Sequence, residues 1–168
     1  MPPAPFPADA TTTQASQPKI GGWLILPAIG LVLGLLRVLS YLGTTLRFYL
    51  SPKRQLLTVP GARLYHLLWQ PLLAYELIGN TIFLLVMAVI AVCFFQKKRI
   101  TPKLLVAFIP VSFLFTLGDH LVAAQIPSLA ATSNHASIGT SLLISFFWMH
   151  VWIPYFLVSK RVQATFVN

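Results

Sequence analysis

Four long apolar segments constrain the fold of this chain more than any other feature. They run over residues 22–46, 69–95, 104–126 and 138–158. Each has about 20 residues or more, which is the length that a helix needs to cross a hydrocarbon core of roughly 30 Å. Inside lipid, a single segment can satisfy its own backbone polar groups only as a helix. The sequence therefore predicts an all-α fold, an integral membrane bundle of four transmembrane helices.

The composition supports this prediction. Of the 168 residues, 57% are apolar and only 9% are charged, and the mean hydropathy is +0.77. Soluble domains have roughly 25% charged residues. A soluble fold of this size could not cover its surface with so few charges.

The connecting segments differ in kind. Residues 1–19 are rich in Pro, Ala and Thr, which predicts a disordered tail ahead of a transmembrane domain at residues 20–168. Residues 47–68 mix basic and apolar side chains, and we expect part of this loop to lie in the membrane interface. Residues 96–103 form a short basic turn, and residues 127–137 are uncharged.

The basic residues predict the orientation. The net charge is +9, and Lys and Arg gather in short clusters that flank the apolar segments. If both termini lie inside, more of the Lys and Arg residues fall on the inner side, as the positive-inside rule requires. We therefore expect both termini in the cytoplasm. The clusters suit lipid headgroups rather than nucleic acid, because no groove-reading motif accompanies them.

Aromatic and basic residues at the segment ends are expected to anchor the helices at the two interfaces. On the predicted inner side, the anchors are Trp23, Trp152, Tyr155, Lys160 and Arg161. Trp69 is the expected anchor on the outer side.

Three charged residues fall inside the predicted spans, namely Arg37, Glu76 and Asp119. A lone charge at the bilayer centre costs at least about 2.5–3.5 kcal/mol. All three lie at a similar depth in the outer half of the membrane, and we hypothesise that Arg37 pairs with Asp119, Glu76 or both. The pair would either fix the helix register or form a site for a proton, an ion or a headgroup. The remaining alternatives are that the carboxylates are protonated or that the Arg37 side chain snorkels outward. The full predicted polar cluster is Arg37, Glu76, Asn80, Asp119 and His120.

Small residues mark the expected helix contacts. Gly30 and Gly34 form a small-xxx-small pattern, and Ser141 and Ser145 lie on one face of the fourth segment. Small side chains let two helices approach closely, and hydroxyl groups can hydrogen-bond across the contact.

Catalytic signatures are absent from the sequence. It contains no Gly-x-Ser-x-Gly motif, no phosphate-binding glycine-rich loop and no His-Glu-x-x-His motif. The histidines lack the spacing of metal ligands. We therefore expect no enzyme activity, no cofactor and no metal.

Two stretches near the ends of the chain carry a family resemblance. The first is GGWLILPAIG at residues 21–30, and the second is WIPYFL at residues 152–157, followed by SKRV and ATF. Together they resemble domain-of-unknown-function family 2569, from residue 19 to the end of the chain. The resemblance implies a small multi-span protein of the bacterial inner membrane. It brings no activity, cofactor or substrate.

Two functions fit these features. The first is a non-enzymatic accessory or assembly protein that packs beside other membrane proteins, which the small size and apolar surface favour. The second is a small proton- or ion-coupled carrier or channel that uses the intramembrane Arg/Glu/Asp cluster. The sequence favours the first. The expected partners are the lipid bilayer and either another membrane protein or a second copy in a homo-oligomer, with no nucleic acid.

Overall fold

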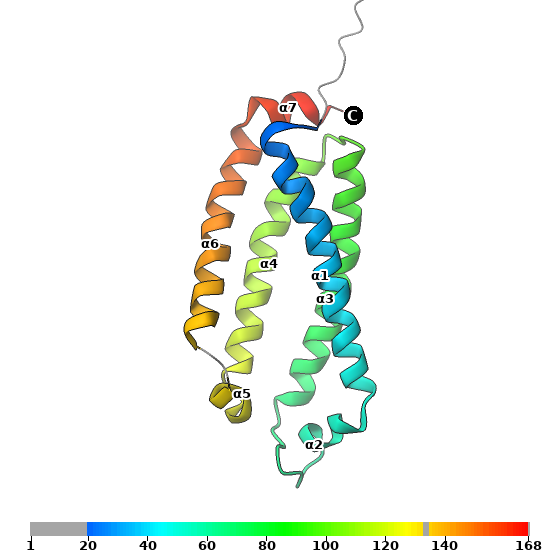
Figure 1. Ribbon diagram of the computed structural model, residues 1–168, viewed down its shortest axis with the longest axis vertical. Coiled ribbons are helices and arrows are strands. Elements are labelled where there is room, and N and C mark those ends of the chain that lie inside the picture. Colours follow the sequence, from blue (N-terminus) through cyan, green and yellow to red (C-terminus); the bar gives the residue numbers. More distant parts are fainter. Residues whose placement is uncertain (1–19, 133–134, 168) are drawn as a thin grey trace, which may run out of the picture.

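The computed structural model describes residues 20–132 and 135–167 (Figure 1). Its regular elements in these ranges are all helices. The predicted disordered tail at residues 1–19 lies outside the described residues.

Four long helices form the body of the protein, and each is long and apolar enough to span a membrane. The fold class predicted from the sequence is therefore confirmed. The four helices are α1 at Ile25–Leu50, α3 at Trp69–Phe95, α4 at Thr101–Ala123 and α6 at His135–Val158. A 3-10 turn, η1 at Gly22–Leu24, leads into α1.

Several helix ends differ from the predicted ones by a few residues, and two of these differences have a clear local reason. α1 continues past residue 46 to Leu50 and stops where Ser51 is extended, since the residue before Pro52 is disfavoured in a helix. α4 begins at Thr101 rather than after Pro102, because proline is well tolerated in the first helical turn.

Short helices lie at both ends of the bundle. At one end, η2 (Pro52–Arg54) and α2 (Gln55–Thr58) follow α1, and α5 (Pro127–Thr132) follows α4. At the other end, α7 (Lys160–Thr165) lies beside the start of α1 (Figure 1). Because both ends of the described chain lie with α7, we call this end the termini side. The end with α2 and α5 is the loop side.

The long helices pack extensively against the long helices next to them in the chain. α1 packs against α3, α3 against α4, and α4 against α6. α1 and α6 are thus the two outer members of the series, and each has a single long helix as its main neighbour.

Aromatic rings make the contact between α3 and α4. The Phe115 ring of α4 lies between Tyr75 and Phe83 of α3, at centroid distances of 4.5 and 4.8 Å. The Tyr75 hydroxyl also donates to the Phe115 carbonyl at 3.0 Å. Gly79 faces the same ring so closely that a Cβ there would overlap it. The absence of a side chain at Gly79 therefore sets the distance between the two helices.

A buried apolar core closes the bundle on the termini side. α7 contributes one face to it, with Ser159 as its N-cap, accepting from the Val162 N–H at 3.4 Å. The core draws on η1, the four long helices and the α7 segment, and its members are Leu24, Leu31, Ile90, Phe94, Leu105, Phe156, Val162 and Phe166.

We expect Gly79→Ala to destabilise the protein by about 1–3 kcal/mol, because the added methyl group overpacks a ring that two neighbours hold in place. The matched control is Gly43→Ala in α1, where a Cβ would meet nothing within 4 Å. Thermal unfolding in detergent micelles measures both. Equal melting temperatures for the two variants would contradict this account of the α3–α4 contact.

Candidate functional site in the membrane-spanning helices

A polar cluster lies in the loop-side half of the bundle, with one side chain from each of three helices. Tyr41 comes from α1, Glu76 from α3 and Asp119 from α4. The Tyr41 hydroxyl is placed to donate to the Glu76 carboxylate, and both interact electrostatically with Asp119. Thr45, one turn after Tyr41, is buried and lies close to the same hydroxyl. This Tyr41–Glu76–Asp119 group is the carboxyl cluster.

Asp119 is the least satisfied member of the carboxyl cluster. Its Oδ1 atom is buried and has no hydrogen-bond partner among the described residues. His120, its neighbour in the chain, is close enough to interact with it electrostatically. A buried acceptor without a donor is costly, so this oxygen is a point where a proton or a polar ligand would be favourable.

Arg37 lies outside the carboxyl cluster. It is exposed on α1, and no described carboxylate forms an ion pair with it, so the pair hypothesised from the sequence is absent here. The reason is helical rotation. At 100° per residue, Arg37 points about 120° away from the buried Leu31 and about 80° away from the buried Thr45. The pairing was predicted from a shared depth and from faces of small and polar residues, and neither of these fixes how one helix is rotated against the next.

Asn80 also stays apart from Asp119. Its side-chain amide donates to the Glu76 backbone carbonyl at 2.8 Å, which folds it onto its own helix. Of the predicted cluster, the structure brings together Glu76, Asp119 and His120.

The small residues predicted at helix contacts fall into two groups. Gly34 faces Met87 of α3, with the methionine Cε 2.6 Å from where a Cβ would lie. Gly30 has no such neighbour within 4 Å. Ser141 and Ser145 are exposed on α6, and the Ser145 hydroxyl donates to the Ser141 carbonyl at 2.9 Å. Gly34 therefore lies at a close contact between two helices.

The two terminal stretches noted in the sequence meet on the termini side. Gly22 has φ +57°, a conformation that favours glycine, and the Arg161 Nη1 lies 2.8 Å from where its Cβ would be. Leu24, Val162 and Phe166 share the buried core. Gly22 therefore both forms the turn and makes room for Arg161.

The predicted interface anchors lie at both ends. Trp152 and Tyr155 pack against the core on the termini side, whereas Trp23 is 70% exposed and Lys160 is exposed. Trp69 begins α3 on the loop side, and its indole N–H is buried without a partner in the described chain.

The comparisons with known proteins give a family. The chain matches the family described as protein of unknown function (DUF2569) over residues 17–167. It belongs to this family. No curated protein and no solved structure matches the chain. The matched DUF2569 region includes both terminal stretches and the carboxyl cluster, so the packing described above lies inside the family region.

Tyr41 belongs to the carboxyl cluster of this DUF2569 chain but was not among the predicted site residues. It lies four residues after Arg37, one helical turn further along α1. Tyrosine is common near membrane interfaces, so its type alone did not separate an anchor from a hydrogen-bond donor. The signal that could have found it is its spacing of one turn from Thr45.

We expect Tyr41→Phe to lower the stability of the protein by about 1 kcal/mol, because it removes the hydroxyl that lies beside the half-buried Glu76 carboxylate. Tyr65→Phe is the control, since Tyr65 has a similar exposure and lies in the loop-side connection outside the carboxyl cluster. Unfolding by titration with a denaturing detergent measures both. A Tyr41→Phe variant as stable as the control would show that this hydroxyl adds nothing.

Proposed function

We propose that this protein is a non-enzymatic accessory or assembly subunit that packs beside a different membrane protein through the exposed side of α1. The observation that carries the proposal is Arg37, an exposed cation in the middle of a membrane-spanning helix with no ion pair to any described residue. We further propose that it is a multi-pass protein of the bacterial cytoplasmic membrane with both termini in the cytoplasm.

Arg37 belongs to a regular stripe along the exposed side of α1. The stripe continues towards both ends of the helix at alternating steps of three and four residues. Its members are all exposed, and they are Gly30, Leu33, Arg37, Ser40 and Thr44. This spacing is typical of a helix seam that packs against another helix. We call it the α1 stripe.

The small residues of the α1 stripe suit close helix contact. Gly30 has open space where a Cβ would lie. The Thr44 hydroxyl donates to the Ser40 carbonyl of its own helix at 3.1 Å, so its polarity is partly satisfied. Small residues of this kind let two helix backbones approach in lipid.

The depth of Arg37 makes lipid alone a poor environment. It lies about 18 Å along the helix from the nearer end of α1, at a rise of 1.5 Å per residue. An unpaired arginine at such a depth costs at least about 2.5–3.5 kcal/mol. A carboxylate on a neighbouring helix would offset this cost through a charge-assisted, bidentate hydrogen bond.

A second copy of this chain is a poor source of that carboxylate. Two copies joined symmetrically through the α1 stripe would bring two Arg37 side chains together. Glu76 and Asp119, the two carboxylates of the described residues, belong to the carboxyl cluster and not to the stripe. The proposed partner is therefore a different membrane protein with an acidic residue inside a span.

The orientation rests on the basic residues of the two sides. Lys97, Lys98, Arg99 and Lys103 lie in or beside the α3–α4 turn, and Lys160 and Arg161 lie in α7, all on the termini side. The loop side carries fewer, which favours a cytoplasmic termini side.

An alternative function is a small proton- or ion-coupled carrier or channel. The buried and unpartnered Oδ1 of Asp119 favours it, because such an atom could take up a proton or coordinate a cation. In that case, Asp119→Asn would abolish a transport phenotype at unchanged abundance, with Arg37 variants unaffected.

We expect Arg37→Gln to reduce capture of a stoichiometric membrane partner at least about tenfold, since losing one desolvated ion pair costs 1.4 kcal/mol or more. The measurement is affinity purification of the tagged full chain in mild detergent, quantified by mass spectrometry. Arg47→Gln is the matched control, because Arg47 is also exposed on α1 but lies in its last turn.

Arg37→Lys is expected to retain part of the partner, since it keeps the charge and loses the planar fork. Two results would overturn the accessory proposal. One is a pure homo-oligomer without a partner, and the other is equal capture by the Arg37→Gln and Arg47→Gln variants.

A further inference from the structure

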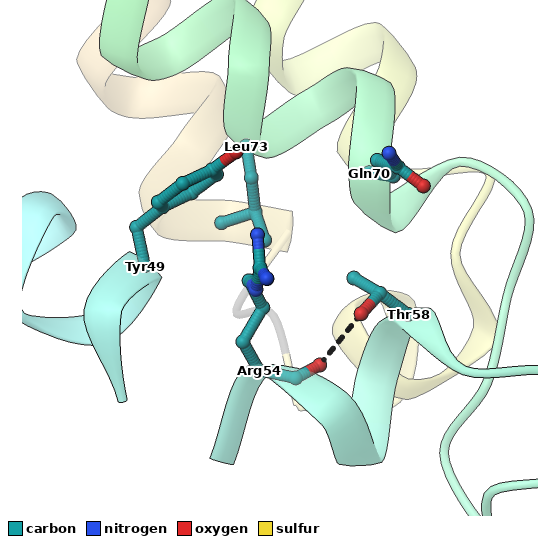
Figure 2. A pocket seen from close by; sticks show the side chains of 5 residues that line it. All are labelled: Tyr49, Arg54, Thr58, Gln70 and Leu73. Atoms are coloured by element: carbon teal, nitrogen blue, oxygen red, sulfur yellow. Dashed lines mark hydrogen bonds between the residues drawn. The ribbon is translucent and has the colours of Figure 1, made fainter. Parts of the chain in front are cut away.

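A small polar cavity lies on the loop side, where the end of α1, the η2–α2 segment and the start of α3 meet (Figure 2). Its volume is about 140 Å³. Figure 2 shows Arg54 and Thr58 facing Gln70 and Leu73 of α3, with Tyr49 beside them. We call it the Arg54 cavity.

Local hydrogen bonds fix the wall that carries Arg54. The Ser51 hydroxyl accepts from the Lys53 N–H at 3.2 Å, which caps η2 just before Pro52. The Thr58 hydroxyl donates to the Arg54 carbonyl at 3.1 Å. The guanidinium carbon of Arg54 lies 4.6 Å from the Tyr49 ring centroid, a cation–π distance. The arginine is thus held in place before any ligand arrives.

The cavity has the chemistry of an anion site. Arg54 is its one cation among the lining residues, and Gln70 adds an amide that can donate. Residues 47–75 contain no Asp or Glu, so no local carboxylate competes for the guanidinium. When a guanidinium stacks on an aromatic ring, its N–H groups remain free at the edge and can donate two parallel hydrogen bonds to a phosphate.

We propose that the Arg54 cavity binds a phosphate group, supplied by a phospholipid headgroup of the loop-side leaflet. The volume fits this chemistry better than a large organic ligand, whose pockets are typically about 300–1,000 Å³. Free inorganic phosphate shares the recognised group and is the other possible source.

The surroundings of the cavity favour the lipid as the source. Leu50, just before η2, and Leu67, just before α3, are each 74% exposed, and Leu56 of α2 is also exposed. Apolar side chains of this kind on a short interfacial segment insert at the boundary between headgroups and acyl chains. The cavity lies between the end of α1 and the start of α3, and the ends of membrane-spanning helices lie at headgroup depth.

This inference is independent of the proposed function. The α1 stripe lies in the hydrocarbon region and the Arg54 cavity at the interface, and they share no residue. Partner capture tests the first, and lipid retention tests the second.

Native mass spectrometry of the full chain, released from maltoside micelles with added phosphatidylglycerol, tests the site. Wild type is expected to retain one lipid, and Arg54→Gln to retain at least about tenfold less, as for the loss of a charged hydrogen-bond donor. Arg63→Gln is the matched control, since it removes the same charge from the same loop at an exposed position outside the cavity. Equal retention by the Arg54→Gln and Arg63→Gln variants would overturn the proposal.

Two further arms keep the test decisive. Circular dichroism checks that each variant folds. If the Arg54→Gln variant misfolds, the Gln70→Leu variant is used in its place, and it is expected to retain severalfold less lipid than wild type. Calorimetric titration of delipidated protein with inorganic phosphate tests the other source. Phosphate binding that depends on Arg54, without lipid retention, would support the anion site and overturn the lipid as its ligand. Binding of neither would overturn the site itself.

Discussion

The hydrocarbon interior of the membrane is the constraint on which the rest of this structure depends. It offers no hydrogen-bond partner, so the backbone must satisfy itself within each helix, and polar side chains must find partners in the protein. The four long helices meet the first demand. Hydroxyl groups such as those of Thr81 and Thr116 donate to carbonyls one turn earlier in their own helices. The Tyr41 hydroxyl of α1 lies beside the Glu76 carboxylate of α3. Arg37 and the Asp119 Oδ1 remain without such a partner among the described residues, and these unmet demands connect the structure to function.

The sequence predicted the number and extent of the spanning helices because bilayer thickness sets their length. Its errors at the helix ends were a few residues long, and two of them came from Pro52 and Pro102, because the effect of a proline depends on the helical turn that it occupies. The sequence predicted the depth of the candidate site residues in the membrane. It did not predict how the helices that carry them are rotated against one another. α3 and α4 are apolar on all sides, so no periodicity identifies the face that meets α1. Arg37 and Tyr41 lie one turn apart and about 40° in rotation. Which of the two side chains meets Glu76 depends on where α3 packs against α1. The sequence pattern of α1 and α3 does not give that packing position.

The two ends of the bundle differ in what holds them together. On the termini side, Gly22 turns with a positive φ beneath Arg161, and η1 and α7 close a shared apolar core. The stretches that carry the family resemblance are therefore accounted for by packing. In this chain, residues of both stretches close the bundle: Leu24, Val162 and Phe166 lie in the shared core. On the loop side, the helices end in short interfacial segments instead, with Arg54 held by a ring and a capped turn.

Depth decides what each unpaired cation can recognise. Arg54 lies at the interface, where phosphate groups are abundant in the lipid itself, so its site can be filled without another protein. Arg37 lies where the only available anion is a carboxylate carried into the membrane by another helix. If both proposals hold, the same guanidinium chemistry selects a lipid at one level and a protein at the other. A chain with both would hold its loop side against the headgroups while α1 remains free to bind its partner. This arrangement suits a subunit whose position in the bilayer must be set before the partner docks.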